Sequence, residues 1–520
     1  MRKMILLPLA LVFASAYAQE RQASDFQRQI LEETFQSFAL TNNAAGMGLA
    51  QPSAGSRTWI GLFGRTGDYH LAQQGDTDYG FQFSTLRYDS FSDKLFMRGT
   101  FSYSLDREKE RNWSDVMDPW FSIPYIYASS VAKVYDSHKC GLTFDLYTAP
   151  LWDVLSFGIR TEYGVADISG MRDPRPRTGY LNYRLVPSVL LTLGRHHLGL
   201  DLGYGYSKEK LSGLTTIQSY PNLYYYKMTG LEHMDGAISG YSGFKRQFAG
   251  SRFLGDLSYS FTGDVLRLLL SGGMEYRKLD AYGDKMQSPG SYNCFTYNGL
   301  ANLILTPGGG LLHRIHLEGK YGDGGADELL QELTSEKDPV TGATTETWET
   351  LYEYKNRYML KTLDAAFSYK LYGTDGYSDY RWSAGLGAAW NGFTKEYYLP
   401  YSGFQSDALT LSLEGSVRLL AVRGHKVDLS ARGSYRKALR TALALDDEES
   451  LYAQEVLRPD RDYYARDVVG ASGSLLWEFP LNLGKAGLAT GYVRLDGGLS
   501  KALPEGKLTR VELSVGLFTF

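Results

Sequence analysis

The sequence lacks three features that would place it in a familiar class. It has only two cysteines, Cys140 and Cys294, in 520 residues, so no disulfide framework holds the chain together. Acidic and basic residues nearly cancel, with a formal net charge of −4, which gives no reason to expect a nucleic-acid partner. Beyond the N-terminus, no apolar run approaches the ~20 residues that a membrane helix needs. Any membrane span must therefore be made of strands.

Residues 1–18 have the features of a secretory signal peptide. Arg2 and Lys3 precede an apolar run from Ile5 to Phe13, and Ala16 to Ala18 has the small-x-small pattern of a cleavage site. We therefore expect export and a mature chain that begins at Gln19. No cysteine follows the cleavage site, so a lipid-modified N-terminus is not expected.

Aromatic residues and glycine are abundant although the chain is not hydrophobic on average. There are 40 Tyr, 24 Phe, 8 Trp and 57 Gly residues, while the mean hydropathy is −0.29. The wall of a β-barrel in lipid needs apolar residues only at alternate positions. Such a wall explains both observations.

Apolar and polar residues alternate strictly along many segments after Arg57. Between Leu95 and Leu105 the odd positions are apolar or glycine, and the even positions include Arg98, Thr100, Ser102 and Ser104. The same period of two covers Leu198 to Tyr206, Leu409 to Ala421 and Val427 to Arg436. This period indicates strands with one apolar and one polar face. Alternation alone also fits a soluble sandwich or propeller.

The connections between these segments separate the two cases. We count 18 strands, and the connections after even-numbered strands are tight, whereas four after odd-numbered strands are long: Glu108 to Ser137, Lys208 to Lys245, Gly322 to Arg357 and Ala438 to Tyr464. Short turns on one side and long loops on the other are typical of outer-membrane barrels. The expected strands lie near residues 58–66, 79–90, 93–107, 138–149, 152–168, 179–193, 196–207, 246–262, 264–280, 291–305, 311–321, 358–372, 378–391, 406–422, 424–437, 465–480, 486–499 and 507–520.

The sequence therefore predicts an all-β fold, an antiparallel transmembrane barrel of about 18 strands (16–18), over residues 57–520. Cys140 and Cys294 then lie six strands apart, which favours two unpaired wall residues over a disulfide. Residues 19–56 form an N-terminal periplasmic or lumen segment with one helix between Ser24 and Leu40, where Ser24 and Gln27 are spaced as a capping box. It is the only convincing helix outside the signal peptide, and either a structural lid or a gate is compatible with it.

The chain ends in Phe518-Thr519-Phe520, and a terminal aromatic residue resembles the signal that outer-membrane barrels present to the barrel-assembly machinery. Phe518 and Phe520 are out of phase with the apolar positions from Val511 to Leu517. We therefore expect a bulge, or a strand that leaves the wall, before Phe518.

A barrel of this size has room for an aqueous lumen. The polar faces of the strands carry both signs of charge, which would either orient a polar solute or form ion pairs that stabilise the wall. The candidate lumen-lining residues are Arg267, Glu275, Arg277, Arg314, Glu318, Glu414, Arg418, Asp428, Arg432, Arg494 and Asp496.

The long loops offer two further candidates. Tyr224, Tyr225 and Tyr226 could contact a sugar or a protein, or could pack among the loops. Asp446, Asp447, Glu448 and Glu449 could gather Ca²⁺, although four consecutive acids usually form a solvated turn. The eight histidines form neither a metal cluster nor a Ser/His/carboxylate set in sequence. We expect no catalytic residue, no metal and no cofactor, and the chain is expected not to be an enzyme.

Two resemblances to known families follow from these residues. Thr41 to Gly48 includes Asn42-Asn43-Ala44-Ala45-Gly46 and resembles the Asn-Pro-Ala-Gly segment of hydrophobic-compound transporters of the long-chain fatty-acid type, although the proline is absent. The signal peptide, the Tyr- and Gly-rich strands and the terminal aromatics resemble large outer-membrane barrel proteins of Bacteroidota with no assigned activity. Some of these accompany TonB-dependent uptake systems, which implies an uptake receptor or surface lipoprotein as a partner.

Three hypotheses for function remain open at this point. The first is a channel or uptake component for a polar or amphipathic solute in the outer membrane. The second is a surface-binding or scaffold barrel that uses its outer loops, and the third is a membrane-embedded hydrolase. The sequence does not identify a substrate.

Overall fold

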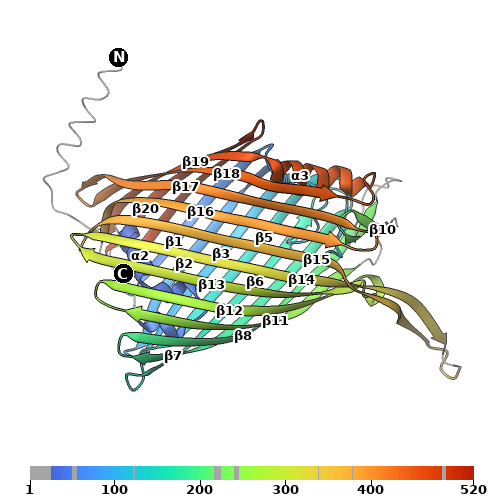
Figure 1. Cartoon of the computed structure of the whole chain (residues 1–520), viewed down its shortest axis with the longest axis horizontal. Helices are drawn as coiled ribbons and strands as arrows, with labels where there is room; N and C mark the ends of the chain where they lie inside the picture. The colour runs from blue at the N-terminus through green and yellow to red at the C-terminus, as the bar shows by residue number, and fades with distance from the viewer. Residues whose placement is uncertain are drawn as a thin grey trace, which may run out of the picture.

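The computed structural model describes residues 25–49, 55–120, 123–215, 224–238, 245–337, 339–376, 379–482 and 488–519. The expected signal peptide at 1–18, the capping residue Ser24 and the terminal Phe520 lie outside these residues. Within them, 18 strands form one antiparallel sheet that closes on itself, because β1 pairs with β2 on one side and with β21 on the other (Figure 1). The prediction of an 18-strand barrel is confirmed.

All 18 expected strands are present, most of them longer than predicted. The strands of the barrel are β1 (Gly55–Gly67), β2 (Thr77–Ser92), β3 (Leu95–Arg111), β5 (Lys133–Thr148), β6 (Leu155–Gly170), β7 (Arg175–Leu193), β8 (His196–Thr215), β11 (Arg246–Thr262), β12 (Leu266–Tyr282), β13 (Gly290–Gly308), β14 (Leu311–Lys337), β15 (Thr344–Asp375), β16 (Asp379–Tyr397), β17 (Ser402–Val422), β18 (His425–Ala444), β19 (Asp467–Asn482), β20 (Leu488–Leu503) and β21 (Lys507–Thr519). A separate small sheet contains β4 (Tyr127–Ala128), β9 (Tyr225–Gly230) and β10 (His233–Ile238).

The two ends of the barrel differ as the sequence predicts. At one end the strands are joined by tight turns, such as the one between β17 and β18, where Arg423 and Gly424 both have positive φ (51° and 81°). Positive φ at both central residues suits the two-residue turns that match the twist of paired strands. At the other end lie the long connections, which include β4, β9 and β10 (Figure 1). We call these the short-turn end and the long-loop end.

The outer and inner faces of the wall follow the period of two. Leu62, Leu257 and Leu413 are among many large apolar side chains exposed on the outside of the wall. On the same strands the intervening polar residues face inward, because successive side chains of a strand point to opposite faces. The barrel is thus apolar outside and polar inside.

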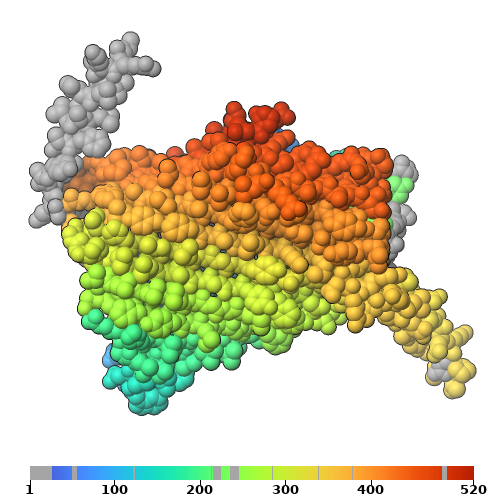
Figure 2. Space-filling view, in the orientation of Figure 1, coloured from blue at the N-terminus to red at the C-terminus, as the bar shows by residue number. Residues whose placement is uncertain are grey.

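One expected long loop is mostly strand. The segment Gly322 to Arg357 continues β14 and β15 as a two-stranded ribbon, paired from Glu328–Tyr354 to Lys337–Thr344. This ribbon, residues 328–354, projects from the long-loop end beyond the body of the barrel (Figure 2). The sequence did not reveal it because charged residues such as Glu332, Glu346 and Glu349 occur on both faces, so the apolar alternation that marks a wall strand is missing.

The N-terminal helix was not the only helix. The connection Ala438 to Tyr464 contains η5 (Ala453–Leu457) and α3 (Arg458–Ala465), which follow one another directly. Pro459 lies at the start of α3, and because proline has no N–H it cannot donate to the preceding helical turn, η5. The prediction of a single helix is therefore wrong. Another short helical turn, η4 (Asp284–Met286), follows β12.

The expected helix between Ser24 and Leu40 is divided into α2 (Asp25–Phe35) and η2 (Ser37–Leu40), followed by η3 (Ala45–Leu49). None of the helices in the described chain is both long and apolar enough to cross a bilayer. Cys140 on β5 and Cys294 on β13 both have free thiols.

The expected break before Phe518 does not occur. β21 remains in continuous register with β1 and β20 as far as Thr519, without a bulge. Phe518 instead points into the barrel, where it is buried against Tyr492 and Phe26. The phase of the apolar residues changes at this position because the interior of the barrel is apolar there.

Candidate functional site

The N-terminal segment 25–49 lies inside the barrel at the short-turn end, and we call it the plug. Its helix α2 is held to the wall by hydrogen bonds. The backbone N–H of Phe26 donates to Glu478 (2.9 Å). The side-chain amide of Gln27 donates through Nε2 to Asp428 (2.9 Å) and accepts through Oε1 from Arg418. Gln27 thus contacts the wall, and the capping box expected with Ser24 lies outside the described residues.

The second half of the plug is fixed by a separate set of polar contacts. The Arg160 guanidinium donates to the carbonyl of Thr41, and the Asn42 amide donates to Asp256 (2.7 Å). The backbone N–H of Ala45 donates to Ser188 (3.0 Å). The segment that resembles the Asn-Pro-Ala-Gly pattern is therefore bonded to the inner wall of β6, β7 and β11.

Apolar contacts also hold the plug against the wall, and we call the wall residues that contact the plug its seat. Phe26 packs within a cluster of Trp59, Leu476, Tyr492 and Phe518. Leu31 packs within a second cluster whose other members are Ile304, Leu312, Tyr372, Tyr380, Ile30 and Phe35. These wall residues lie near the short turns, so the plug covers this mouth of the barrel.

The long-loop end is covered by a second structure, which we call the cap. It contains residues 112–120 and 123–132, β9, β10 and residues 446–466, and these segments bury a large apolar cluster against the inner wall. At its centre Trp113 is fully buried, and its indole N–H donates to Glu455 (2.7 Å). Arg246, also fully buried, donates to Glu209 (2.9 Å) and to the carbonyl of Asp115 (3.2 Å).

Helix α3 brings a buried carboxylate into the cap. Asp460 accepts a hydrogen bond from the backbone N–H of Ala72 (2.8 Å) and is 5% exposed. Burial raises the pKa of Asp460 to about 6, against the opposing effects of the Ala72 N–H, Lys395 and His70. Tyr463 from the same helix stacks on Tyr69 with 4.5 Å between ring centroids. The helix therefore ties the last long loop to the connection between β1 and β2.

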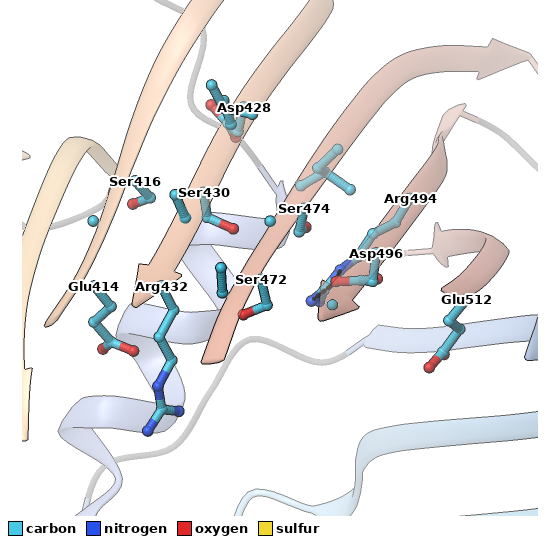
Figure 3. Close-up of a pocket in the computed structure, with 18 of the residues that line it drawn as sticks. Glu414, Ser416, Asp428, Ser430, Arg432, Ser472, Ser474, Arg494, Asp496 and Glu512 are labelled. Atoms are coloured by element: carbon cyan, nitrogen blue, oxygen red, sulfur yellow. Dashed lines mark hydrogen bonds and ion pairs between the residues drawn. The ribbon is translucent and has the colours of Figure 1, made fainter. Parts of the chain in front are cut away.

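Between plug and cap lies a polar cavity of about 740 Å³, which we call the chamber. Its floor is formed by Phe26, Gln27 and Ile30 of α2, and its wall by side chains of β15 to β21 (Figure 3). Two further cavities of about 670 and 700 Å³ lie along other parts of the inner wall. Arg510 and Glu512 line both the chamber and the third cavity, so these two spaces adjoin.

The side chains of the chamber are arranged in two cross-strand rows. The first row runs through Ser416, Ser430, Ser474, Asp496 and Glu512, each the register partner of the next. The second row runs in the same way through Glu414, Arg432, Ser472, Gly498 and Arg510. Neighbouring strands are about 4.8 Å apart, so the first row is a continuous ladder of closely spaced polar groups, and the second is interrupted at Gly498.

Charges of both signs balance in the chamber. The lining contains Lys370, Arg432, Arg494 and Arg510, and against them Glu414, Asp428, Asp496 and Glu512. Two ion pairs are formed within it, Lys370–Glu414 and Arg494–Asp496, each at 2.6 Å. The chamber therefore has no excess charge that would select one sign of ion.

The structure places the eleven candidate lumen residues on the inner face of the barrel. Five of them line the chamber: Glu414, Asp428, Arg432, Arg494 and Asp496. Glu318 lines the second cavity, and Arg277 borders a smaller space of about 150 Å³ below the cap. The other four lie at the following places: Arg418 beside Gln27, Arg267 over the ring of Phe35, Arg314 hydrogen-bonded to Asn302, and Glu275 beside Arg252.

The three consecutive tyrosines do not share one environment. Tyr225 is fully buried among Tyr127, Leu211 and Leu214, whereas Tyr224 is exposed. Tyr226 packs on Trp113 with 5.2 Å between ring centroids. Most of this group thus belongs to the cap.

Sequence reasoning overlooked the serines of the chamber and the residues that build the cap. The serines were visible on the polar faces of alternating strands, for example Ser430 beside Arg432, but only charged positions were selected. The role of Trp113 and Arg246 had no local signal, because the cap forms through contacts between loops distant in sequence.

No catalytic or metal-binding group emerges among the described residues. There, no three His, Cys, Asp or Glu side chains are grouped to hold a metal, and the acids Asp446 to Glu449 lie in the turn before η5. The nearest approach to a triad is Ser402, Glu232 and His233, but Ser402 is buried and donates to the carboxylate rather than to the imidazole. A nucleophile needs the base itself as its hydrogen-bond acceptor.

Several solved structures resemble this chain in fold. A FadL homologue from Pseudomonas aeruginosa is 12% identical, with 92% of this chain and 93% of that chain covered and a TM-score of 0.34. The CymD monoaromatic hydrocarbon channel is 9% identical, with 98% and 96% covered and a TM-score of 0.31. The ferric citrate transporter FecA in the unliganded form is 9% identical, with 90% and 79% covered and a TM-score of 0.40. Likeness at this level carries no argument about function.

No curated protein matches the chain. A family model does match it from residue 44 to residue 519, which includes the last residues of the plug, 44–49, and the whole described barrel. The chain belongs to this family, described as a family of unknown function (DUF6850).

Proposed function

We propose that this chain is an outer-membrane uptake component that takes a polar solute through its lumen. The observation that carries the proposal is the chamber, a polar space enclosed by an apolar-faced barrel and covered at both ends by segments of the same chain. The apolar outer face and the short-turn/long-loop asymmetry support insertion in an outer membrane, with the cap outside and the plug on the periplasmic side.

In this proposal the resting barrel is closed and solute passage requires movement of both the cap and the plug. The plug is the better candidate for a moving part, because it touches the wall through individual hydrogen bonds and two small apolar clusters. The cap shares a large continuous apolar cluster with the wall. A TonB-dependent receptor or a surface lipoprotein would supply the solute or the energy, and the barrel-assembly machinery would insert the barrel.

A disulfide between plug and wall tests this proposal. A Cβ added to Gly199 on β8 would lie 3.4 Å from Cγ of Asn43, so Asn43→Cys with Gly199→Cys would place two sulfurs within bonding reach. The native thiols are first removed by Cys140→Ser and Cys294→Ser, and the cap is loosened by Trp113→Ala. In planar bilayers we expect channel openings after reduction and none after oxidation.

Two results would contradict the proposal. One is equal conductance in the oxidised and reduced protein, which would mean that the plug does not control the lumen. The other is the absence of channel openings in the reduced protein, even when Gly158→Val also weakens the contact between plug and wall. The unlocked protein, with the same three background substitutions, is the matched control.

The ribbon of β14 and β15 favours a second candidate function, the binding of a surface partner. Lys285 contacts one of its faces. The Lys285 ammonium pairs with Glu346 (3.0 Å), and the Lys285 carbonyl accepts a hydrogen bond from the Trp348 indole N–H (3.1 Å). The other face exposes Leu330 opposite Tyr352, and it places Glu332 directly opposite Glu349. Like charges in register are unfavourable, and a partner with a basic surface would relieve them.

Co-purification from native membranes, followed by mass spectrometry, tests this second candidate. A stoichiometric partner should be lost with Leu330→Ser/Tyr352→Ser and kept with Val340→Ser at the ribbon tip, where the side chain is also exposed. A barrel that purifies without any stoichiometric partner would contradict the scaffold function.

A further inference from the structure

We infer that the chamber binds a neutral, hydroxyl-rich solute of the oligosaccharide or polyol class. This inference rests on the proposed uptake function and names its substrate class. It is carried by the chemistry of the lining, which combines many hydroxyl groups with balanced charge in one enclosed space.

The lining of the chamber is rich in hydroxyl groups. Seven serines line the chamber, from five consecutive strands. Ser383 and Ser416 bond to each other at 2.6 Å. Within the described part of the chain, no protein hydrogen bond reaches the hydroxyls of the other five, Ser430, Ser434, Ser472, Ser474 and Ser500.

A free hydroxyl both donates and accepts, so these five groups complement a solute that does the same at each of its own hydroxyls. They occur on three adjacent strands, and Ser430 and Ser474 are direct cross-strand partners. These two hydroxyls therefore lie on neighbouring strands about 4.8 Å apart, and on β20 the same row continues with the carboxylate of Asp496. An acyl chain would displace water from these groups without replacing its hydrogen bonds, which is unfavourable.

The charges of the chamber favour a neutral solute. Because the four cationic and four anionic side chains balance, a solute with net charge would gain no attraction from the chamber as a whole. Arg432, which donates to Ser412 at 3.2 Å, retains further N–H groups for a ligand. Glu414 and Asp496 supply acceptors on either side of it, so charged hydrogen bonds to a neutral solute are available in both directions.

The size of the chamber suits a short oligosaccharide. Its volume of about 740 Å³ lies within the ~300–1,000 Å³ range of ligand pockets. Glycines on β19 and β20 and the small serine side chains take up little room on this part of the wall. A short oligosaccharide would therefore lie along the rows rather than in a deep pocket.

Calorimetric titration of the full-length protein in nanodiscs tests the inference. The probes are maltotriose, tri-galacturonate, a chitosan trimer and laurate, with empty nanodiscs as the blank. Wild-type protein and the two opening variants, Gly158→Val and Trp113→Ala, are titrated, so that access to the chamber does not depend on a single substitution. We expect maltotriose to bind more tightly than the two charged trimers and laurate.

Serine substitutions then locate the site. Ser430→Leu and Ser472→Leu should each weaken maltotriose binding by about tenfold or more, because a hydroxyl is lost and the space is narrowed. Ser251→Leu is the matched control, since Ser251 lies on the outer face of β11 beside Tyr204. The affinity for maltotriose should be the same with and without this control substitution.

The outcomes separate this inference from the proposed function. Preferential binding of a charged trimer or of laurate overturns the inference, and so does maltotriose binding that both serine variants retain. The absence of saturable binding to the opening variants up to about 10 mM also overturns it. If the disulfide lock controls conductance in each of these cases, the uptake function stands with another substrate class.

Discussion

Gly158 of β6 touches the backbone of Ala45 in the plug so closely that a Cβ on Gly158 would overlap the Ala45 nitrogen. The second half of the plug therefore lies on a part of the wall that has no side chain. Six residues along the same strand and on the same face, Gly164 has no such neighbour, since its Cβ would lie 4.0 Å from the nearest atoms. These two glycines form a matched pair for testing the seat of the plug.

The substitution Gly158→Val should lift residues 41–48 from the wall. Overpacking typically costs about 1–3 kcal/mol, and here that cost opposes seating of the plug rather than folding of the barrel. Hydrogen exchange of residues 41–48 should become faster, while exchange of the barrel strands remains slow. Gly164→Val should leave the plug unchanged, and equal exchange in the two variants would show that β6 does not form the seat.

The other half of the plug depends on Phe26. Its ring lies 6.1 Å from that of Phe518 and 5.7 Å from that of Tyr492, both in edge-on geometry. Phe26→Ala should remove about 3 kcal/mol from the seating of α2, which would appear as faster exchange of residues 26–35. Phe253→Ala on the outer face is the control. Slow exchange of α2 in the Phe26 variant would contradict this account.

The sequence was sufficient for the barrel and insufficient for what lies inside it. Leu95 to Leu105 could be assigned to a strand because lipid on one side and water on the other impose a pattern that is local in sequence. Phe518 broke the pattern, and a bulge was expected. The actual cause is Phe26, 492 residues earlier, which makes the interior apolar at this point.

The candidate site too could be predicted only in part from the sequence. Arg432 and Asp496 could be placed inside the barrel from alternation alone, and both line the chamber. The enclosure of the chamber could not be predicted, because it depends on loops that fold inward and pack on one another. Trp113, in a segment without periodicity, is the centre of that packing.

Trp113 provides a graded test of the cap. Trp113→Phe keeps an aromatic ring but leaves Glu455 without the indole donor, at a cost of about 1–3 kcal/mol. Trp113→Ala also removes the buried ring and should cost about 3–5 kcal/mol of cap packing. Proteolysis of the long loops in proteoliposomes should therefore be fastest for Ala, intermediate for Phe and slowest for wild type. Trp152→Ala, at an exposed site in a short turn, should resemble wild type, and identical rates for all four proteins would rule out this role.

Asp460 makes the stability of the cap depend on pH. Since burial raises its pKa from 3.8 to about 6, the folded cap favours the protonated form. The stabilising contribution is fully present below about pH 4 and is lost as the pH rises through about 6. A shift of about two units corresponds to about 3 kcal/mol. The cap should therefore open more readily at neutral pH than at pH 4.5.

Asp460→Asn should abolish most of this dependence. The asparagine oxygen can still accept from the Ala72 N–H, but the side chain has no charge to bury. At pH 7.5, residues 453–465 should exchange more slowly in the variant than in wild type, and near pH 4.5 the two should agree after correction for intrinsic exchange. Asp462→Asn, an exposed neighbour paired with Arg461, should keep the wild-type profile. Faster exchange of Asp460→Asn at pH 7.5 would instead show that the cap uses the ionised carboxylate, held by Lys395 and His70.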